Sequence, residues 1–238
     1  YSKDFLGSVD ALDIRSGEWT RKKELLVPRC FHAVVPVSGR LYVFGGLSEE
    51  TNSIAVEVFD SQQNSWSQVT TLPRARNRLD AVALGSKIYL ISGIGDKKLR
   101  DTHDLSAVDI YDTKSGEWSL GPDLPVPCHG ASAAVLRDKI HVVWQKHHWV
   151  LERGTWKKLA PPPALQLFAR LEVVDRHLFA IGGRYSPRQL FSYDPKEDKW
   201  KSLANLPLPL NRFASAVADG FIFTLGGEGQ EQEFEVNE

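Results

Sequence analysis

The sequence contains no methionine, only two cysteines and no long apolar run. Cys30 and Cys128 are too few for a disulfide framework or a four-ligand zinc site, and they favour a reducing, intracellular setting. No apolar stretch is long enough to cross a bilayer, and no signal or transit peptide is recognisable. Because residue 1 is Tyr and methionine is absent, we interpret the sequence as a domain cut from a longer chain.

Excess charge and enzyme motifs are also missing. The 29 basic and 30 acidic residues give a net charge of −1, which argues against a general nucleic-acid-binding or membrane-binding surface. No P-loop, GxGxxG, GxSxG or HExxH motif occurs, so we expect no cofactor, no metal and no catalysis. One alternative stays open: Asp101-Thr-His-Asp104 places three possible metal ligands in one loop.

What the sequence does contain is an internal repeat of about 47 residues, and no stretch has a helical period. Its clearest marker is a tryptophan that returns five times, at Trp19, Trp66, Trp118, Trp156 and Trp200. Before four of them, at seven residues, stands an apolar or aromatic residue followed by Asp: Leu12, Phe59, Tyr111 and Tyr193. An apolar strand ending in a glycine pair also recurs, as in 40–46, and the third copy lacks both the pair and the aromatic.

Each copy is predicted to form four short strands, which in the first complete copy span 32–37, 40–44, 54–60 and 66–70. Four-stranded units at this period predict an all-β fold, a β-propeller with five blades of four antiparallel strands. Residues 1–27 and 212–227 would share the closing blade, and the acidic stretch 228–238 would be a tail of this single domain. We expect the glycine pairs to allow close backbone approach, and the Trp and its aromatic partner to fill the space between blades.

These features together resemble the Kelch repeat, over roughly residues 8–227. The resemblance is strong in the first, second, fourth and fifth glycine strands and fails in the third, where Val143-Trp144 replaces the glycine pair. It is closest to the Kelch domain of BTB-Kelch ubiquitin-ligase adaptors. The resemblance implies that one loop face of a five-bladed Kelch β-propeller binds a peptide partner.

Candidate binding residues follow from counting back thirteen residues from the aromatic position of each glycine strand. The count from Tyr42 gives Arg29 and that from Tyr89 gives Arg76, and the next two positions in each copy fall in the same loops. Since equivalent positions of a repeat lie on one face, we expect their side chains to point at one surface. With the loop after the fourth glycine strand, the candidates are Arg29, Arg76, Asn77, Arg78, His129, Gln166, Arg184, Tyr185, Asn211 and Arg212.

The surplus of arginine at these positions predicts a protein or peptide partner with acidic residues, because guanidinium pairs with carboxylate in bidentate fashion. The resemblance implies a substrate-recognition domain of a Cullin-RING ubiquitin ligase adaptor, with Cullin bound by a domain outside this segment. It would be cytoplasmic, with the nucleus as an alternative. Other readings are a cytoskeletal, actin-binding scaffold, a metal-dependent enzyme, or redox sensing by Cys30 or Cys128 beside Arg29 or His129.

Overall fold

The computed structural model describes residues 5–49, 51–95 and 103–228, which form two compact units, Tyr1–His129 and Gly130–Glu238. All regular elements among these residues are strands, which confirms the all-β fold class. Within the described residues, no helix has the length and hydropathy that a membrane crossing requires. Asp101, Thr102 and the predicted tail after residue 228 lie outside the described residues.

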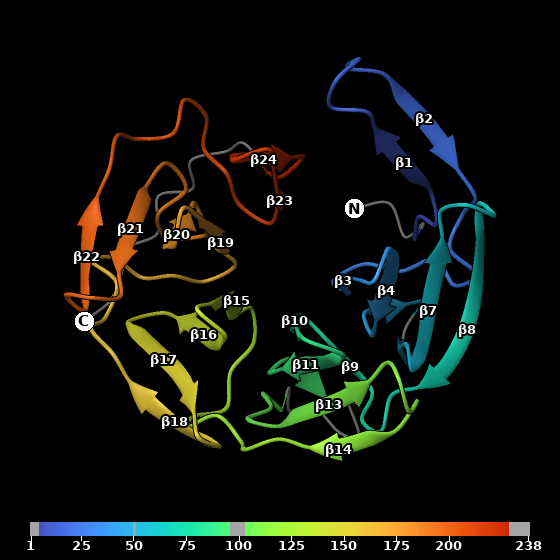
Figure 1. Ribbon diagram of the computed structural model, residues 1–238, viewed down its shortest axis with the longest axis horizontal. Helices are drawn as coiled ribbons and strands as arrows, with labels where there is room; N and C mark the ends of the chain where they lie inside the picture. The colour runs from blue at the N-terminus through green and yellow to red at the C-terminus, as the bar shows by residue number, and fades with distance from the viewer. Residues whose placement is uncertain (1–4, 50, 96–102, 229–238) are drawn as a thin grey trace. The chain divides into compact units, whose positions relative to one another are not determined.

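The first unit contains two four-stranded antiparallel sheets in which the strands follow chain order (Figure 1). One consists of β3 (Ala33–Val37), β4 (Arg40–Phe44), β7 (Ala55–Asp60) and β8 (Ser65–Thr71). The other consists of β10 (Asp80–Leu84), β11 (Lys87–Ile91), β13 (Val108–Asp112) and β14 (Trp118–Leu120). Three two-stranded pairs complete the unit: β1 (Val9–Leu12) with β2 (Trp19–Lys22), β5 (Leu47–Ser48) with β6 (Thr51–Asn52), and β9 (Arg76–Asn77) with β12 (Ile94–Gly95).

The second unit repeats this plan with two further four-stranded antiparallel sheets. One consists of β15 (Ser132–Leu136), β16 (Lys139–Trp144), β17 (His147–Glu152) and β18 (Thr155–Lys158). The other consists of β19 (Arg170–Val174), β20 (His177–Ile181), β21 (Leu190–Asp194) and β22 (Lys199–Ser202). The last pair is β23 (Ala214–Ala218) with β24 (Phe221–Leu225). The predicted four-stranded repeat is therefore confirmed in four copies.

The repeated aromatics pack as the sequence predicts. Ring centroids lie 5.0 Å apart in the pair Phe59 and Trp66, and again 5.0 Å apart in Tyr111 and Trp118. Trp118 also packs against Phe44 of the preceding sheet, with centroids 6.4 Å apart, and its indole N–H donates to Thr70 Oγ1 at 3.3 Å. Each aromatic pair thus ties its own outer strands to the sheet before it, inside the core of the unit.

The glycine pairs 45–46 and 182–183 stand where neighbouring backbone leaves no room for a side chain. A Cβ at Gly45 would lie 2.5 Å from the carbonyl oxygen of Arg76, and one at Gly182 would lie 2.5 Å from that of Leu210. Gly46 has φ +94, a conformation that other residues rarely adopt. The predicted close backbone approach is confirmed.

The third copy departs from the expected loop. The other copies continue into a loop after the glycine strand, but here His147 and His148 already lie in β17. The reason is a two-residue connection, Gln145 and Lys146, where the other copies have a longer loop, and Gln145 takes the positive φ of 49 that this tight turn needs. His141 is buried in β16, where its ring centroid lies 5.2 Å from that of His148.

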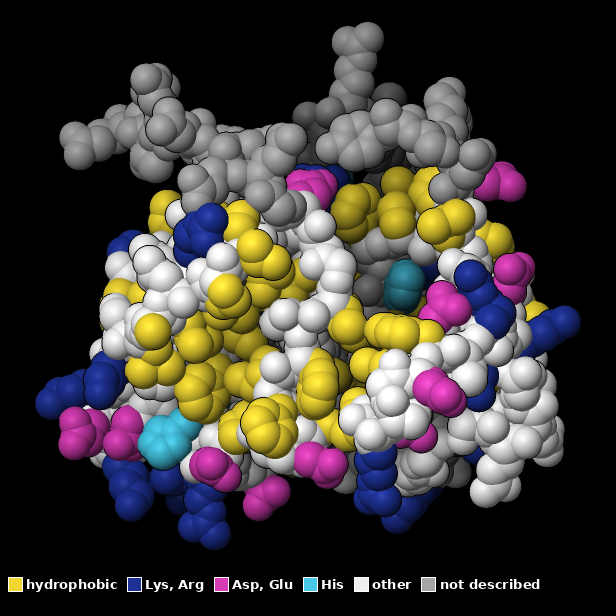
Figure 2. Space-filling view, turned by 90° about the horizontal axis from the view of Figure 1, so that it is seen from above, with side chains coloured by type: hydrophobic (Ala, Val, Ile, Leu, Met, Phe, Trp, Pro, Cys, Tyr) yellow, Lys and Arg dark blue, Asp and Glu magenta, His cyan; other side chains and the backbone are white. Residues whose placement is uncertain are grey.

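The two terminal strand pairs are the candidates for the predicted closing blade. Among the described residues, β1 with β2 and β23 with β24 each form a two-stranded sheet, so the closure and the count of five blades stay predictions. Phe221 is 68% exposed and Val217 and Leu225 are also exposed, as expected of a half-sheet that lacks neighbouring strands. Figure 2 shows apolar side chains gathering on the face seen from above.

Candidate functional site

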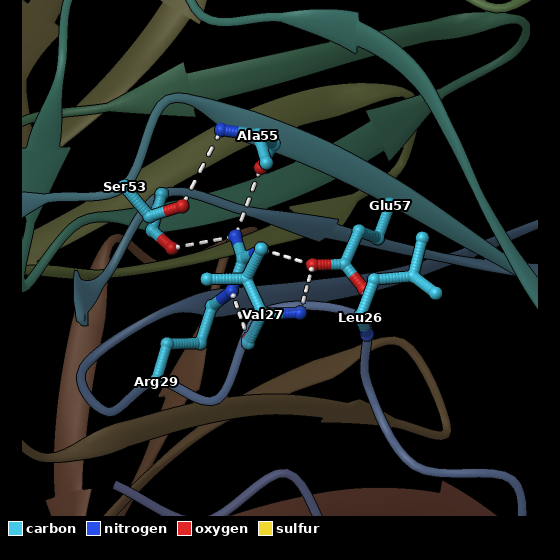
Figure 3. Close-up of polar contacts among 7 residues, drawn as sticks. Leu26, Val27, Arg29, Ser53, Ala55 and Glu57 are labelled. Carbon is cyan, nitrogen blue, oxygen red and sulfur yellow. Dashed lines mark hydrogen bonds and ion pairs between the residues drawn. The ribbon is translucent and has the colours of Figure 1, made fainter.

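Arg29, the residue thirteen before Tyr42, lies in the segment that joins β2 to β3 (Figure 3). Its side chain is buried. Its guanidinium forms an ion pair with Glu57 of β7 and donates to the carbonyl oxygens of Gly45 at 3.1 Å and Ala55 at 2.8 Å. Its Nε donates to the carbonyl oxygen of Val27 at 3.0 Å. Burial lowers the pKa of Arg29, and the carboxylate of Glu57 opposes that shift.

Glu57 is fully satisfied by the same segment. Its carboxylate accepts the backbone N–H of Leu26 at 2.7 Å and that of Val27 at 3.1 Å (Figure 3). The two carbonyl groups that Arg29 binds belong to Gly45 and Ala55, which flank the loop 46–54. A single ion pair therefore closes the base of that loop and fixes the incoming chain to β7.

Arg76 repeats the arrangement one copy later. Its buried guanidinium forms an ion pair with Asp109 of β13 and donates to the carbonyl oxygens of Ser92 at 3.0 Å and Ala107 at 3.1 Å. The latter two residues flank the loop 93–106. Arg74, which is partly exposed, also pairs with Asp109, at 2.6 Å and 3.2 Å. Burial lowers the pKa of Arg76 and the Asp109 carboxylate opposes the shift.

Gln166 holds the corresponding position in the fourth copy without any charge. Its buried amide nitrogen donates to Ser186 Oγ at 3.2 Å and to the carbonyl oxygen of Ala164 at 3.2 Å. Phe191 stands where the first two copies have Glu57 and Asp109, two residues before the repeated aromatic. The amide therefore meets a hydroxyl in place of a carboxylate.

The expectation that these three side chains point at the surface is wrong. Arg29, Arg76 and Gln166 are at most 3% exposed, and their polar atoms bind backbone carbonyls and neighbouring side chains of their own unit. The repeat count located the loop backbone correctly but not the direction of the side chain. We name the three residues with their partners the loop clamps.

Two residues beyond the position of Arg29, Arg76 and Gln166, the backbone turns left-handed in all five copies. The φ angles there lie between 52° and 64°, at Phe31, Arg78, Gly130, Phe168 and Arg212. Only glycine adopts this conformation without cost, and bulky residues held in it are rare and cluster at functional sites. Four of the five positions nevertheless hold Phe or Arg, so the fold presents large side chains at a strained position.

These left-handed residues stack on one another within each unit. In the first unit the Arg78 guanidinium carbon lies 4.8 Å from the centroid of the Phe31 ring, and the Arg78 N–H donates to the Phe31 carbonyl at 2.9 Å. In the second unit Arg212 lies 5.6 Å from the Phe168 centroid. A Cβ at Gly130 would meet the Phe168 ring at 2.4 Å, which explains the glycine there.

Phe31 and Phe168 are functional candidates that the sequence reasoning did not select. Both stand at the same place in the repeat as Arg78 and Arg212, so the count that found the arginines also reaches the aromatics. Residue type alone does not mark them, because a single phenylalanine in a β-protein is ordinarily a core residue. Phe31 is 36% exposed, and in both stacks the ring supports a cation.

The remaining predicted residues are partly exposed and engage polar neighbours. The Asn77 amide donates to Asn52 Oδ1 at 2.6 Å, and His129 Nδ1 lies 2.8 Å from Asp104 Oδ1. In the second unit, the Arg184 guanidinium carbon lies 5.8 Å from the ring centroid of Tyr185, which is 40% exposed. Asn77 is adjacent to Arg78 in the chain and therefore lies beside the Phe31 and Arg78 stack. His129 belongs to the same unit.

Asn211 and Arg212 share one carboxylate. Arg212 NH1 donates to Glu228 Oε1 at 3.0 Å, and Asn211 Nδ2 donates to Glu228 Oε2 at 3.5 Å. Both Arg212 and Glu228 are partly exposed. The loop surface is therefore less basic than the arginine positions alone predict.

The geometry does not favour the two alternative chemistries, redox sensing by a cysteine and metal binding. Burial raises the pKa of both thiols, that of Cys128 to about 12, which contradicts the idea that Arg29 or His129 activates a cysteine. Among the described residues, no group of three His, Cys, Asp or Glu side chains is placed to hold a metal ion. Asp101, one of the three possible ligands in its loop, lies outside those residues.

Comparison with known proteins agrees with this geometry. The model of the KLHDC2/KLHL20/DRC7 Kelch-repeats domain matches residues 1–144, and the Kelch motif matches residues 168–207. The chain is 27% identical to mouse Kelch-like protein 35 over 94% of its own length and 39% of the relative's. It is 26% identical to human Kelch-like protein 34, over 92% of this chain and 38% of the relative.

A plant relative extends the comparison: an F-box/kelch-repeat protein of Arabidopsis thaliana is 32% identical over 79% of this chain and 46% of the relative. The chain thus spans between about a third and a half of the length of these curated relatives. The glycine pairs, the aromatic pairs and the family model, which covers more than half of the residues, all agree. The chain therefore belongs to the family of the KLHDC2/KLHL20/DRC7 Kelch-repeats domain.

Proposed function

We propose that this Kelch domain is a protein-interaction module without catalytic activity of its own, which binds a short peptide carrying acidic residues. In the first unit the contacts would come from the partly exposed loop residues Asn77, Arg78 and His129, with Phe31 as stacking partner. In the second unit they would come from Arg184, Tyr185, Asn211 and Arg212, with Phe168 as stacking partner. The observation that carries the proposal is the left-handed repeat position, where Arg and Phe occupy a strained backbone.

The physical argument concerns the orientation of the guanidinium groups. A guanidinium laid by one face on an aromatic ring has fewer rotamers, so less conformational entropy is lost when a ligand binds. Its N–H groups lie in the plane in which a carboxylate pairs in bidentate fashion. Arg78 on Phe31 and Arg212 on Phe168 both have this arrangement.

The wider proposal is that the domain recognises substrates for a Cullin-RING ubiquitin ligase adaptor, in the cytoplasm, with the nucleus as an alternative. It is supported by the Kelch-like relatives and by a zebrafish relative whose name states both Kelch repeats and a BTB domain. Cullin would bind a domain outside the 238 residues, so the chain alone should not bind Cullin. We propose no membrane or nucleic-acid partner, in keeping with the balanced charge.

The test is charge reversal at the two stacked arginines. We expect Arg78→Glu and Arg212→Glu each to weaken capture on an array of acidic peptides by about tenfold or more, because a repulsive charge replaces an attractive one. Lys201→Glu is the matched control: it makes the same change of charge on the exposed strand β22 and should leave capture unchanged. Thermal unfolding of every variant checks that the fold survives.

Retained binding in both arginine variants, with the fold intact, would refute the acidic-peptide site. Co-sedimentation with actin filaments at physiological salt by a chain that captures no peptide would instead favour the cytoskeletal scaffold.

A further inference from the structure

Glu228 stands in a place that no other copy fills with an acid. It follows the glycine pair of the last strand, and its N–H donates to the Asn211 carbonyl at 2.8 Å. The equivalent pairing joins Leu47 to Cys30 and Ile94 to Asn77 in the first unit. These two equivalents are apolar, whereas Glu228 puts a carboxylate beside the left-handed arginine.

The Arg212 guanidinium therefore has an aromatic ring on one side and a carboxylate at its edge. Phe168 supplies the ring at 5.6 Å, and Glu228 Oε1 accepts from NH1 at 3.0 Å. The second oxygen, Oε2, accepts from the Asn211 amide at 3.5 Å. One carboxylate thus takes both donors, as an acidic ligand side chain would.

We propose that Glu228 is an internal ligand of the Arg212 and Asn211 site, and that an acidic peptide must displace its side chain to bind there. This inference rests on the proposed peptide-binding function. Displacement requires rotation of one exposed side chain only, because the backbone pairing with Asn211 can persist. Since Glu228 is held next to Arg212, its carboxylate competes at a high effective concentration and sets a threshold of ligand charge.

The same repeat position also distinguishes the surroundings of the two stacked arginines, Arg78 and Arg212. Arg78 has Ile94 where Arg212 has Glu228, so the two arginines differ in the charge that this repeat position places beside them. Removing the Glu228 charge should make these two surroundings more alike.

The experiment uses the whole 238-residue chain and a fluorescein-labelled tetraglutamate peptide, with tetraglutamine as the neutral counterpart, followed by fluorescence anisotropy. We expect Glu228→Gln to bind tetraglutamate about three- to tenfold more tightly than the wild type, the range expected when an exposed ion pair no longer competes and a like charge is removed. Adding Arg212→Gln to Glu228→Gln should abolish the gain. Glu197→Gln, which removes an equal charge from an exposed turn of the same unit, should change the affinity less than twofold.

Unchanged or weaker binding by Glu228→Gln, or an equal gain in Glu197→Gln, overturns the internal-ligand proposal. If tetraglutamate binds and Arg78→Glu weakens it while Glu228→Gln has no effect, only this inference fails and the acidic-peptide function stands. If neither the wild type nor Glu228→Gln binds tetraglutamate, the acidic-peptide function fails as well.

Discussion

The two units build the same loop base with different chemistry. In the first, Arg29 with Glu57 and Arg76 with Asp109 are buried ion pairs that hold the carbonyls at both ends of a loop. In the second, Gln166 meets Ser186 and the acid is replaced by Phe191. In these three copies arginine and carboxylate are present together or absent together, which indicates that the arginine serves its partner and not a ligand.

The comparison also separates two kinds of arginine that lie two residues apart. Arg76 is buried and clamps a loop, while Arg78 has a left-handed backbone and stacks on Phe31. A buried charge is stable only when it is paired, so the first kind should control stability. The second kind should control binding.

The largest effect is expected from breaking a charged clamp. Arg29→Met leaves the buried Glu57 carboxylate without its cation, and should lower the free energy of unfolding by about 3–5 kcal/mol. Gln166→Ala in the neutral clamp leaves no charge behind and should cost only about 1–2 kcal/mol. Urea denaturation followed by tryptophan fluorescence measures both.

A double substitution that places the residue types of the neutral clamp in the first unit tests the same point further. Arg29→Gln combined with Glu57→Phe reproduces the residue types of Gln166 and Phe191 in the first unit. It should recover at least half of the stability lost in Arg29→Met, because no unpaired charge remains buried. A double variant as unstable as the single one would show that the clamp depends on its charge.

The second effect is a pH dependence to which a buried histidine pair of the second unit contributes, beside His32 of the first unit, whose pKa burial lowers to about 4. His141 Nδ1 lies 3.0 Å from His148 Nε2 in the core, and His148 Nδ1 lies 3.3 Å from the Ala160 carbonyl. Since that carbonyl can only accept, His148 Nδ1–H donates to it, and in a neutral pair His148 Nε2 accepts a hydrogen bond from His141 Nδ1–H. Burial lowers the pKa of His141 to about 4 and that of His148 to about 3.

Because both folded-state pKa values lie below the ordinary value of 6.5, the unfolded chain binds more protons on acidification. The pair's contribution is complete above pH 6.5 and is lost as the pH falls from 6.5 towards 4. The loss should be roughly 3 kcal/mol over that window. His141→Tyr with His148→Val, the residues of the first copy at these places (Tyr42 and Val56), should remove it. An unchanged pH profile of unfolding in that double variant would contradict this origin.

The smallest expected change in stability comes from the left-handed position. Arg78→Gly relieves backbone strain of about 1 kcal/mol and loses a stacking contact of similar size, so the net change in unfolding free energy should stay within about 1 kcal/mol. Binding of tetraglutamate should nevertheless weaken. Differential scanning fluorimetry and anisotropy separate the two effects, and a large drop in the unfolding temperature would reassign Arg78 to the scaffold.

Much of the fold could be read from local patterns. The strand predicted at 40–44 is observed as β4, and the rings of Phe59 and Trp66 pack as expected, because alternation, turns and aromatic spacing are properties of short segments. The early start of β17 at His147 could not be read in the same way, because the tight turn at Gln145 and Lys146 contains no glycine.

The sequence by itself determined the repeat, the strands, the glycine pairs and the loops in which binding residues stand. Only the tertiary structure decided which of those residues face solvent. Repeat spacing fixes the path of the backbone, whereas the direction of a long side chain depends on partners distant in sequence, such as Glu57 for Arg29 and Glu228 for Arg212. A buried carboxylate draws a guanidinium inward, because either charge alone would cost too much to bury.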